Sequence, residues 1–216
     1  SRQSDRECAI EQWRGLFQLL QNRLDMDVAL LEPRPGLPDM VFTANGGMVW
    51  GNKYIASNFR YEVRRGEVER FVNWFQVRGY EIHHLPAEYV FEGEGDLLSG
   101  GEVLFAGYHT GSNIQSHQMV SEILKREVLS LELTNKWFYH LDTCFCPLGK
   151  GRALYYPLAF DSYALKVLED RIPNLIPISE EEAKKFACNA IVAGNDVVMN
   201  EGCPDVRSKL ERLGFT

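Results

Sequence analysis

The residues best suited to chemistry are a histidine and an aspartate near the middle of the chain, His140 and Asp142, in the segment Trp-Phe-Tyr-His-Leu-Asp-Thr-Cys-Phe-Cys-Pro. In an extended strand, alternate side chains point to the same face, so these two would lie side by side. An imidazole beside a carboxylate, with aromatic side chains to exclude water, could transfer a proton and bind a cationic group. A half-buried strand with a hydrogen-bonded histidine would show the same pattern.

A cluster of acids forms the second candidate. The run Phe-Glu-Gly-Glu-Gly-Asp contains Glu92, Glu94 and Asp96, which are three carboxylates within five residues. Packing acids together on a rigid element is unfavourable unless a cation, a proton or a metal relieves their repulsion. The glycines between them would let a ligand or another backbone segment approach closely. This run is therefore the strongest functional candidate in the chain.

A third candidate is a group of arginines, Arg60, Arg64 and Arg65, that precedes a helical pattern. Most charge clusters of this kind are simply solvated. Near the acids, however, one of these guanidinium groups could bind a substrate carboxylate through two hydrogen bonds.

The elements that would position these residues form a repeat. Each unit has an apolar strand with a polar end, a glycine-containing turn, a second strand, a helix and a third strand. The polar ends are Asn45, Asp96, Asp142 and Asn189, which are spaced 51, 46 and 47 residues apart. A period near this value predicts a repeat architecture. A closed ring of such α/β units would bring the polar ends together at its axis.

Apolar spacing and turn residues predict the individual elements. Helices are expected at 1–24, at 116–126, 161–170, 180–186 and 205–213, and in the segment that carries Val68 and Phe75 and ends at Gly79. Strands are expected at 28–31, 48–57, 80–85, around Gly100, and at 128–133, 138–144, 153–157, 175–178 and 197–200.

Composition limits the class of protein. With 216 residues, 45% hydrophobic and 25% charged, the chain is within the range of one globular domain. No apolar run reaches the roughly 18 residues of a membrane span, and the N-terminus lacks a signal-peptide pattern. These features predict a cytoplasmic protein. The net charge of −7 disfavours nucleic acid and anionic membranes as partners. The five cysteines are odd in number and are expected to be reduced.

Three motifs together resemble the guanidino-group-modifying enzymes. They are Pro-Asp-Met-Val-Phe-Thr-Ala-Asn at 38–45, Phe-Glu-Gly-Glu-Gly-Asp at 91–96 and Phe-Tyr-His-Leu-Asp-Thr-Cys-Phe-Cys-Pro-Leu at 138–148. This superfamily includes arginine deiminase, dimethylarginine dimethylaminohydrolase, amidinotransferases and the cyanobacterial type of arginine dihydrolase. The last is the most similar, because it also ends the first motif in asparagine. The resemblance implies a five-fold pseudosymmetric α/β propeller, the pentein fold, with residues 1–216 as a single catalytic domain.

The resemblance also implies roles for residues that match the motifs. His140 would be the general acid and base, and Glu92 would support it and hold the guanidinium. The residues expected to bind substrate are Asp39, Asn45, Arg64, Asp96 and Asp142. Among these, Arg64 would bind the substrate carboxylate and Asp142 would be a second partner of the guanidinium. Asn45 stands where other members place a guanidinium-binding acid.

The implied reaction is hydrolysis at the guanidinium carbon of arginine or a methylated arginine, through a cysteine-linked covalent intermediate and without a cofactor or metal. In the family, the nucleophile lies in a C-terminal Gly-Gly-x-x-x-Cys segment. The repeat spacing puts this segment after Thr216, and the first hairpin of the ring is also missing. We therefore expect a partial domain, incomplete at both termini, that lacks the nucleophile.

Alternatives remain at this point. A non-catalytic pentein-fold binding protein would also lack the nucleophile, and an amidinotransferase would share most of the motifs. A metal site at His140, Asp142, Cys144 and Cys146 is disfavoured, because Cys-x-Cys is not the usual zinc spacing. The two cysteines are interpreted as buried structural thiols. The sequence leaves open the exact substrate, whether the product is citrulline or ornithine, and whether the protein forms a homo-oligomer.

Overall fold

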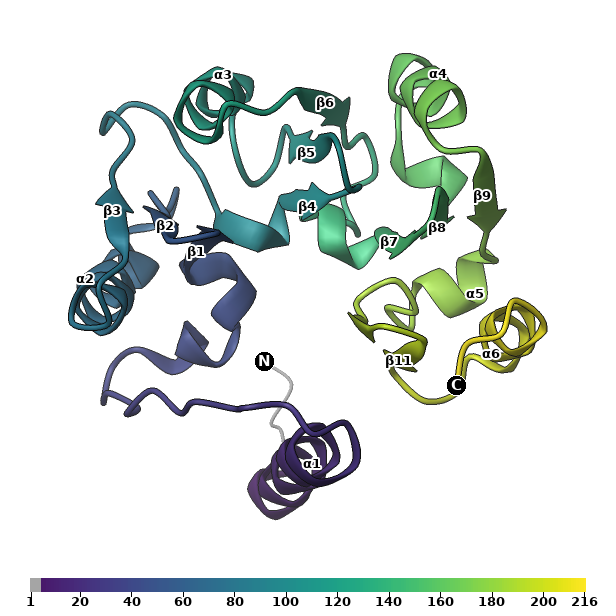
Figure 1. Cartoon of the computed structure of the whole chain (residues 1–216), viewed down its shortest axis with the longest axis horizontal. Helices are drawn as coiled ribbons and strands as arrows, with labels where there is room; N and C mark the ends of the chain where they lie inside the picture. Colours follow the sequence, from purple (N-terminus) through teal and green to yellow (C-terminus); the bar gives the residue numbers. More distant parts are fainter. Residues whose placement is uncertain (1–4) are drawn as a thin grey trace.

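The computed structural model describes residues 5–216. Three successive units of the same order lie side by side around the centre of the molecule (Figure 1). In each unit a short 3-10 turn leads into an antiparallel hairpin, and after a helix a third strand pairs in parallel with the second. The chain is therefore a mixed α/β protein built from repeated units.

The bounds of the elements follow the expected order closely. The first unit comprises the 3-10 turns η2 (Pro38–Val41) and η3 (Thr43–Gly46), strands β1 (Gly47–Trp50) and β2 (Lys53–Ala56), helix α2 (Glu62–Gln76) and strand β3 (Glu81–His83). The second comprises η4 (Gly93–Gly95), β4 (Leu97–Ser99), β5 (Leu104–Tyr108), α3 (Ile114–Leu124) and β6 (Val128–Glu132). The third comprises η5 (Leu141–Thr143), β7 (Phe145–Gly149), β8 (Arg152–Tyr155), η6 (Pro157–Ala159), α4 (Ser162–Arg171) and β9 (Asn174–Pro177).

A further segment continues the pattern after β9. It contains helix α5 (Glu180–Ala183), strands β10 (Ile191–Ala193) and β11 (Asp196–Val198) and helix α6 (Pro204–Arg212). The last residue, Thr216, pairs with the backbone beside β11, because its N–H donates to Asn195 and its carbonyl accepts from Val197. In this segment, too, a chain returning from a helix comes to lie next to the second strand of the hairpin.

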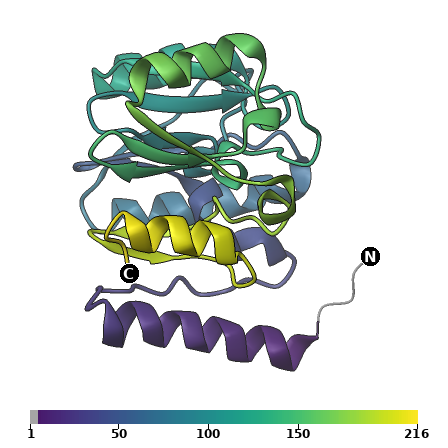
Figure 2. The same cartoon turned by 90° about the vertical axis from the view of Figure 1, so that its right-hand side faces the viewer.

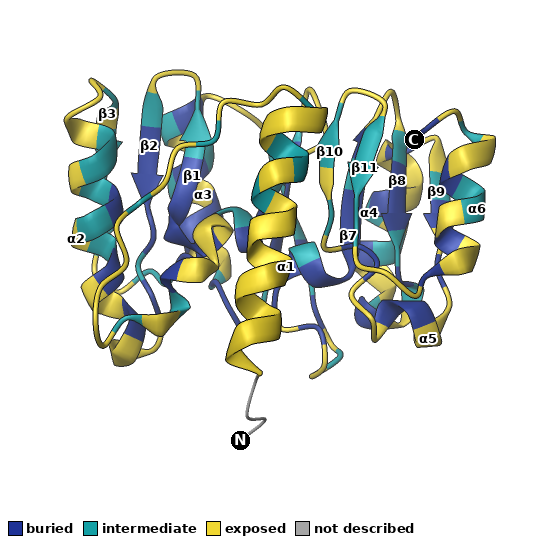
Figure 3. Ribbon diagram, turned by 90° about the horizontal axis from the view of Figure 1, so that it is seen from below, coloured by how far each residue is buried: buried dark blue, intermediate teal, exposed yellow. Residues whose placement is uncertain are grey.

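Each helix is the crossover that a parallel third strand requires. In α4, Ala164 and Leu168 are fully buried against the sheet, whereas Tyr163 is exposed on the opposite side. Figure 3 shows the same division, with buried strands and helices that expose one face. Burying a leucine side chain is worth roughly 1.5–3 kcal/mol, so these faces hold the helices in place. The rings of Phe105 and Phe145, whose centroids are 5.2 Å apart, join the second and third units.

The N-terminal part differs from the repeated units. Helix α1 (Arg6–Gln18), continued by a π-helical turn η1 (Leu19–Arg23), has no fully buried residue and exposes Trp13 and Leu16. Figure 2 shows it lying outside the layers formed by the other elements. The helix predicted at 1–24 is confirmed from Arg6 to Arg23, and residues 1–4 of that prediction lie outside the described residues. The strand predicted at 28–31 is wrong, because these residues run without pairing in any strand.

One local prediction about the central motif is also wrong. Residues 138–144 do not form a strand in which His140 and Asp142 alternate with outward-facing neighbours. His140 is extended, but the next three residues form the 3-10 turn η5 before β7 begins. The tight turn, rather than strand alternation, brings the imidazole and the carboxylate to the same side. Separately, no helix within residues 5–216 is long and apolar enough to cross a membrane.

Candidate active site

The 3-10 turns at the start of the three units meet at the centre of the molecule. Turn η4 packs against η3 on one side and against η5 on the other. Gly93 allows the first of these contacts: its φ of +61° is left-handed, and an added Cβ would lie 2.6 Å from the carbonyl oxygen of Ala44. The polar residue beside each turn is therefore carried into one region, as the repeat spacing predicted.

A short contact between side chains in this region joins His140 to Glu92. Nε2 of His140 lies 2.7 Å from Oε2 of Glu92, and both side chains are buried. On the other side of the ring, Nδ1 lies 3.3 Å from the amide nitrogen of Asn45. The imidazole is thus fixed between residues of the first two units.

The surroundings of this pair stabilise the charged form of each partner. Burial tends to lower the pKa of His140, but the hydrogen bond to Glu92 and the negative charges of Asp96, Glu92 and Asp142 outweigh it, so the pKa is raised. For Glu92, burial tends to raise the pKa, but the hydrogen bond and charge of His140, with smaller contributions from Arg60 and Arg64, lower it. The pair therefore favours a carboxylate beside an imidazolium.

Asp142 has a different environment. Burial is the main reason why its pKa is raised to about 7, and the charge of Asp96 acts in the same direction, while the charge of His140 opposes them. A carboxyl group with this pKa is only partly ionised near neutral pH. A bound cation such as a guanidinium would favour its ionised form.

A cavity of about 550 Å³ opens beside His140. Polar side chains from the three units and the following segment line it: Asp39, Asn45, Arg64, Glu92, His140, Asp142 and Asn189. Exposed aromatic side chains also line it: Phe42, Tyr61, Tyr139 and Phe186. Carboxylates together with aromatic rings suit a planar organic cation.

Asp96 is the one predicted site residue that does not line this cavity. It is 1% exposed, and its oxygens accept hydrogen bonds from Ser112 N–H (2.8 Å), the Ser112 hydroxyl (2.8 Å) and Leu141 N–H (3.1 Å). These contacts tie η5 to the segment after β5. Asp96 therefore supports His140 from behind and contributes charge, which differs from the substrate contact that the sequence suggested.

Arg64 lines the cavity, but most of its donors are used. Nε and Nη2 donate to the two oxygens of Glu67 at 3.0 and 2.8 Å, Nη2 also donates to the carbonyl of Asp39, and Nη1 donates to Oδ1 of Asn45. The guanidinium also lies over the ring of Phe59. Only one N–H remains, so Arg64 does not present the two-pronged group expected for a substrate carboxylate.

Three further residues lie near the site: Arg60, which the sequence indicated only as one of three candidate arginines, and Ser112 and Glu67, which it did not indicate as site residues. Arg60 donates from Nε and Nη2 to the carbonyl of Gly111, so its Nη1 is left for another partner. Gly111 itself lines the cavity. Ser112 links Asp96 to the backbone of Glu92, and Glu67 fixes Arg64. The Arg-x-x-Glu spacing on a helix was a signal for the last of these; nothing local in the sequence indicated Ser112.

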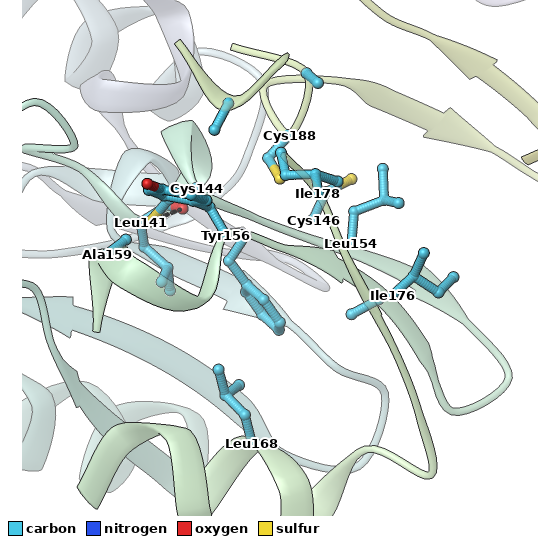
Figure 4. Close-up of a cluster of buried hydrophobic side chains, with 14 of the residues drawn as sticks. Leu141, Cys144, Cys146, Leu154, Tyr156, Ala159, Leu168, Ile176, Ile178 and Cys188 are labelled. Carbon is cyan, nitrogen blue, oxygen red and sulfur yellow. Dashed lines mark hydrogen bonds between the residues drawn. The ribbon is translucent and has the colours of Figure 1, made fainter. Parts of the chain in front are cut away.

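The cysteines do not line this cavity. Cys144, Cys146 and Cys188 are packed among apolar side chains of the third unit and the following segment (Figure 4). Burial is the main cause of the raised pKa of each thiol, which is about 12 for Cys146. Such thiols stay protonated and are poor nucleophiles. In residues 5–216, no group of three histidine, cysteine or acidic side chains could hold a metal ion.

Comparison with known proteins agrees with this arrangement. The chain is 44% identical over 216 residues to the bifunctional arginine dihydrolase/ornithine cyclodeaminase AgrE of Nostoc sp., covering 98% of this chain and 30% of that protein. It is 36% identical over 211 residues to the N(G),N(G)-dimethylarginine dimethylaminohydrolase of Mycobacterium tuberculosis, covering 98% and 69%. The chain thus spans less than a third of the bifunctional relative.

Solved structures show the same likeness in three dimensions. The N-terminal domain of the cyanobacterial arginine dihydrolase ArgZ, bound to product, superposes with a TM-score of 0.95 at 43% identity, covering 99% of this chain and 79% of that one. The Pseudomonas aeruginosa dimethylarginine dimethylaminohydrolase, bound to citrulline, gives 0.85 at 27% identity, covering 98% and 80%. A family model described as N,N dimethylarginine dimethylhydrolase, eukaryotic, matches residues 1–200. The chain therefore belongs to the N,N-dimethylarginine dimethylhydrolase family of guanidino-modifying proteins.

Proposed function

We propose that this chain forms the substrate-binding part of a hydrolase that acts on the guanidinium carbon of arginine or a methylated arginine. One observation carries the proposal: Glu92, His140 and Asp142, which come from two different units, line one cavity. A guanidinium is a planar, delocalised cation whose N–H groups match carboxylate oxygens. Two carboxylates next to an imidazole provide both the binding groups and the proton carrier for such a substrate.

The guanidinium is held by Glu92 and Asp142, and Asn45 adds an amide contact. Asp39, at the side of the cavity, faces the amino-acid end of the substrate. The substrate carboxylate is bound by the single remaining N–H of Arg64, which lines the cavity, together with Nη1 of Arg60, which lies outside the lining but holds the carbonyl of Gly111 at its edge.

The reaction proceeds in two steps. A thiolate attacks the guanidinium carbon and forms a C–S bond, and as the C–N bond breaks the imidazolium of His140 gives its proton to the departing amine. Water then attacks the same carbon, the neutral imidazole accepts a proton from it, and cleavage of the C–S bond regenerates the thiolate. The product carries a C=O in place of the lost C–N bond.

The thiolate is supplied from outside residues 5–216. The buried cysteines Cys144, Cys146, Cys188 and Cys203 do not line the cavity, and Cys8 is exposed on α1. The repeated units support a ring of five such units, the pentein propeller, in which residues 1–216 are one partial catalytic domain. An additional segment of the ring would carry the nucleophile to the open side of the cavity.

The position of the cysteines also favours a second candidate, a binding protein that holds guanidino compounds without turnover. Assays of the full-length protein that contains this chain, with several guanidino substrates, distinguish a hydrolase, a binding protein and an amidinotransferase. Release of ammonia from arginine, or of dimethylamine from dimethylarginine, supports the hydrolase. Tight binding of arginine in calorimetry without any product supports the binding protein. Transfer of the amidino group to an added amine, with no hydrolysis, would show an amidinotransferase.

A further inference from the structure

A continuous chain of hydrogen bonds links the first turn of α2 to the imidazole of His140. Nη1 of Arg64 donates to Oδ1 of Asn45 at 3.1 Å, and Nδ2 of Asn45 lies 3.3 Å from Nδ1 of His140. On its other side, Nε2 of His140 lies 2.7 Å from the carboxylate of Glu92. All four side chains are buried. The imidazole is therefore held between an amide and a carboxylate, with little water to compete for either contact.

The atoms in this chain have defined roles. A guanidinium has donors only, so the atom of Asn45 that faces Arg64 must be the carbonyl oxygen, and the amide nitrogen faces His140. Because an amide nitrogen only donates, Nδ1 accepts this hydrogen bond in the neutral ring and carries no proton there. The proton of the neutral ring then lies on Nε2, where Glu92 accepts it. Of the two neutral tautomers, the contacts allow only this one.

Arg64 is itself held in place by Glu67. The two oxygens of Glu67, which is 1% exposed, accept hydrogen bonds from Nε and Nη2 at 3.0 and 2.8 Å. Nη2 also donates to the backbone carbonyl of Asp39 at 3.1 Å. Arg64 cannot turn away from Asn45 without breaking a buried, two-pronged ion pair, and such pairs are costly to break. Glu67 thus holds Arg64 in place, and Arg64 determines the orientation of the Asn45 amide.

We propose that Arg64 and Glu67 are positioning residues, which fix the tautomer of His140 through the amide of Asn45 and oppose protonation of its Nδ1. A proton on Nδ1 would face the N–H groups of the amide. The amide cannot turn over to accept it, because its nitrogen would then face the guanidinium. This inference rests on the proposed function, since a defined tautomer matters when the imidazole transfers protons.

The surroundings of the ring act in opposite directions on its charge. Burial disfavours the imidazolium, and the amide that Arg64 orients acts in the same direction, whereas Glu92, Asp96 and Asp142 favour it and raise the pKa of His140. Because Nε2 keeps its proton against Glu92 in both the neutral and the charged ring, the proton that the ring gains and loses is the one on Nδ1. A leaving amine must therefore take this proton on the Asn45 side of the ring.

Nitrogen-15 NMR of histidine-labelled, full-length protein tests the proposal without substrate. The His140 signals are assigned by their loss in His140→Ala. In the wild type and in Glu69→Gln, an exposed control on the same helix, the neutral ring is expected to be protonated on Nε2 alone. In Glu67→Gln, whose amide cannot accept both guanidinium N–H groups, both tautomers are expected. The pKa should rise by about one unit, the size of one ordinary hydrogen bond.

Asn45→Asp gives a second, independent reading. Its carboxylate could accept from Arg64 and from Nδ1 together, so His140 is expected to be protonated at Nδ1 over a wider pH range, with a still higher pKa. An Nδ1-protonated neutral ring in the wild type would overturn the proposal, as would a Glu67→Gln spectrum identical to that of Glu69→Gln. If Glu67→Gln does not fold, an unchanged ring in Asn45→Asp overturns it. These signals do not depend on turnover, so failure of the proposed hydrolase activity would be recognised separately.

Discussion

Nε2 of His140 and Oε2 of Glu92 lie 2.7 Å apart, although 48 residues separate them in the sequence. The contact depends on the packing of η4 against η5, so it is a product of the repeated architecture rather than of either motif alone. Because both groups are buried, each stabilises the charged form of the other more than it would in water. The following predictions use the full-length protein that contains this chain.

Removing the charge of Glu92 is expected to impair proton transfer. Glu92→Gln should lower kcat by roughly 10²-fold or more, the usual contribution of acid–base catalysis. The carboxylate raises the pKa of His140, so without it the imidazolium loses its proton at a lower pH. The alkaline limb of kcat against pH should therefore move to lower pH. An unchanged limb would show that Glu92 does not act on His140, and Glu69→Gln is the control.

Gly111 is expected to tolerate no side chain. A Cβ at this position would overlap the carboxylate of Asp96 and lie 2.8 Å from Cδ2 of His140. Gly111→Ala should therefore displace the imidazole, and a displacement of about 1 Å can reduce activity by about 10²-fold. Gly15→Ala on α1, where an added Cβ has no neighbour within 4 Å, should leave activity unchanged. Equal activities of the two variants would contradict the close packing around His140.

Asp142 is expected to destabilise the folded protein, because its carboxyl group is partly buried in the cavity. Burial raises its folded-state pKa to about 7, so the folded protein binds more protons than the unfolded chain between about pH 4 and 7. This contribution makes the protein less stable as pH rises through that range. Asp142→Asn should therefore increase the free energy of unfolding more at pH 8 than at pH 5, by roughly 1–3 kcal/mol after allowance for partial exposure.

The measurement is urea unfolding of both proteins at the two pH values, together with turnover. The variant should be more stable and less active, because one of the carboxylates that hold the guanidinium is gone. An effect of the substitution on stability that is the same at pH 5 and pH 8 would show that Asp142 titrates normally.

Arg60 is expected to bind the carboxylate of the substrate. Arg60→Met should raise KM for arginine by about tenfold or more, the effect of losing a charge-assisted hydrogen bond, with a smaller change in kcat. Agmatine, which resembles arginine without the carboxylate, should be affected little by the substitution. If the two substrates respond equally, Arg60 acts on the structure of the cavity instead. Arg14→Met, on the exposed surface of α1, is the matched control.

Much of the fold followed from the sequence because its signals are local. Apolar spacing and glycine turns predicted the β1–β2 hairpin, α4 and α6 within a few residues. The spacing of Asn45, Asp142 and Asn189 predicted that they would come together, and all three line the cavity. Periodicity reports such features because each unit must bury the same faces.

Other features depended on contacts between distant segments. The 3-10 turn at Leu141–Thr143 replaces an expected strand because it must pack against η4, and an alternating pattern contains no information about that neighbour. Asp96 was expected in the cavity because the repeat spacing places it among the polar strand ends and the family motif implies a substrate contact. Its place behind His140 depends on donors from Ser112 and Leu141, which the sequence could not bring near it.

The most direct test of the account is the rate of ammonia release from L-arginine by three forms of the full-length protein: wild type, His140→Ala and His83→Ala. His83 is on β3 and does not line the cavity, so its variant should retain nearly the full rate. His140→Ala should lose activity by at least about 10²-fold while still binding arginine. A His140→Ala variant that releases ammonia, or dimethylamine from dimethylarginine, as fast as the wild type would contradict the assignment of His140 as the proton carrier.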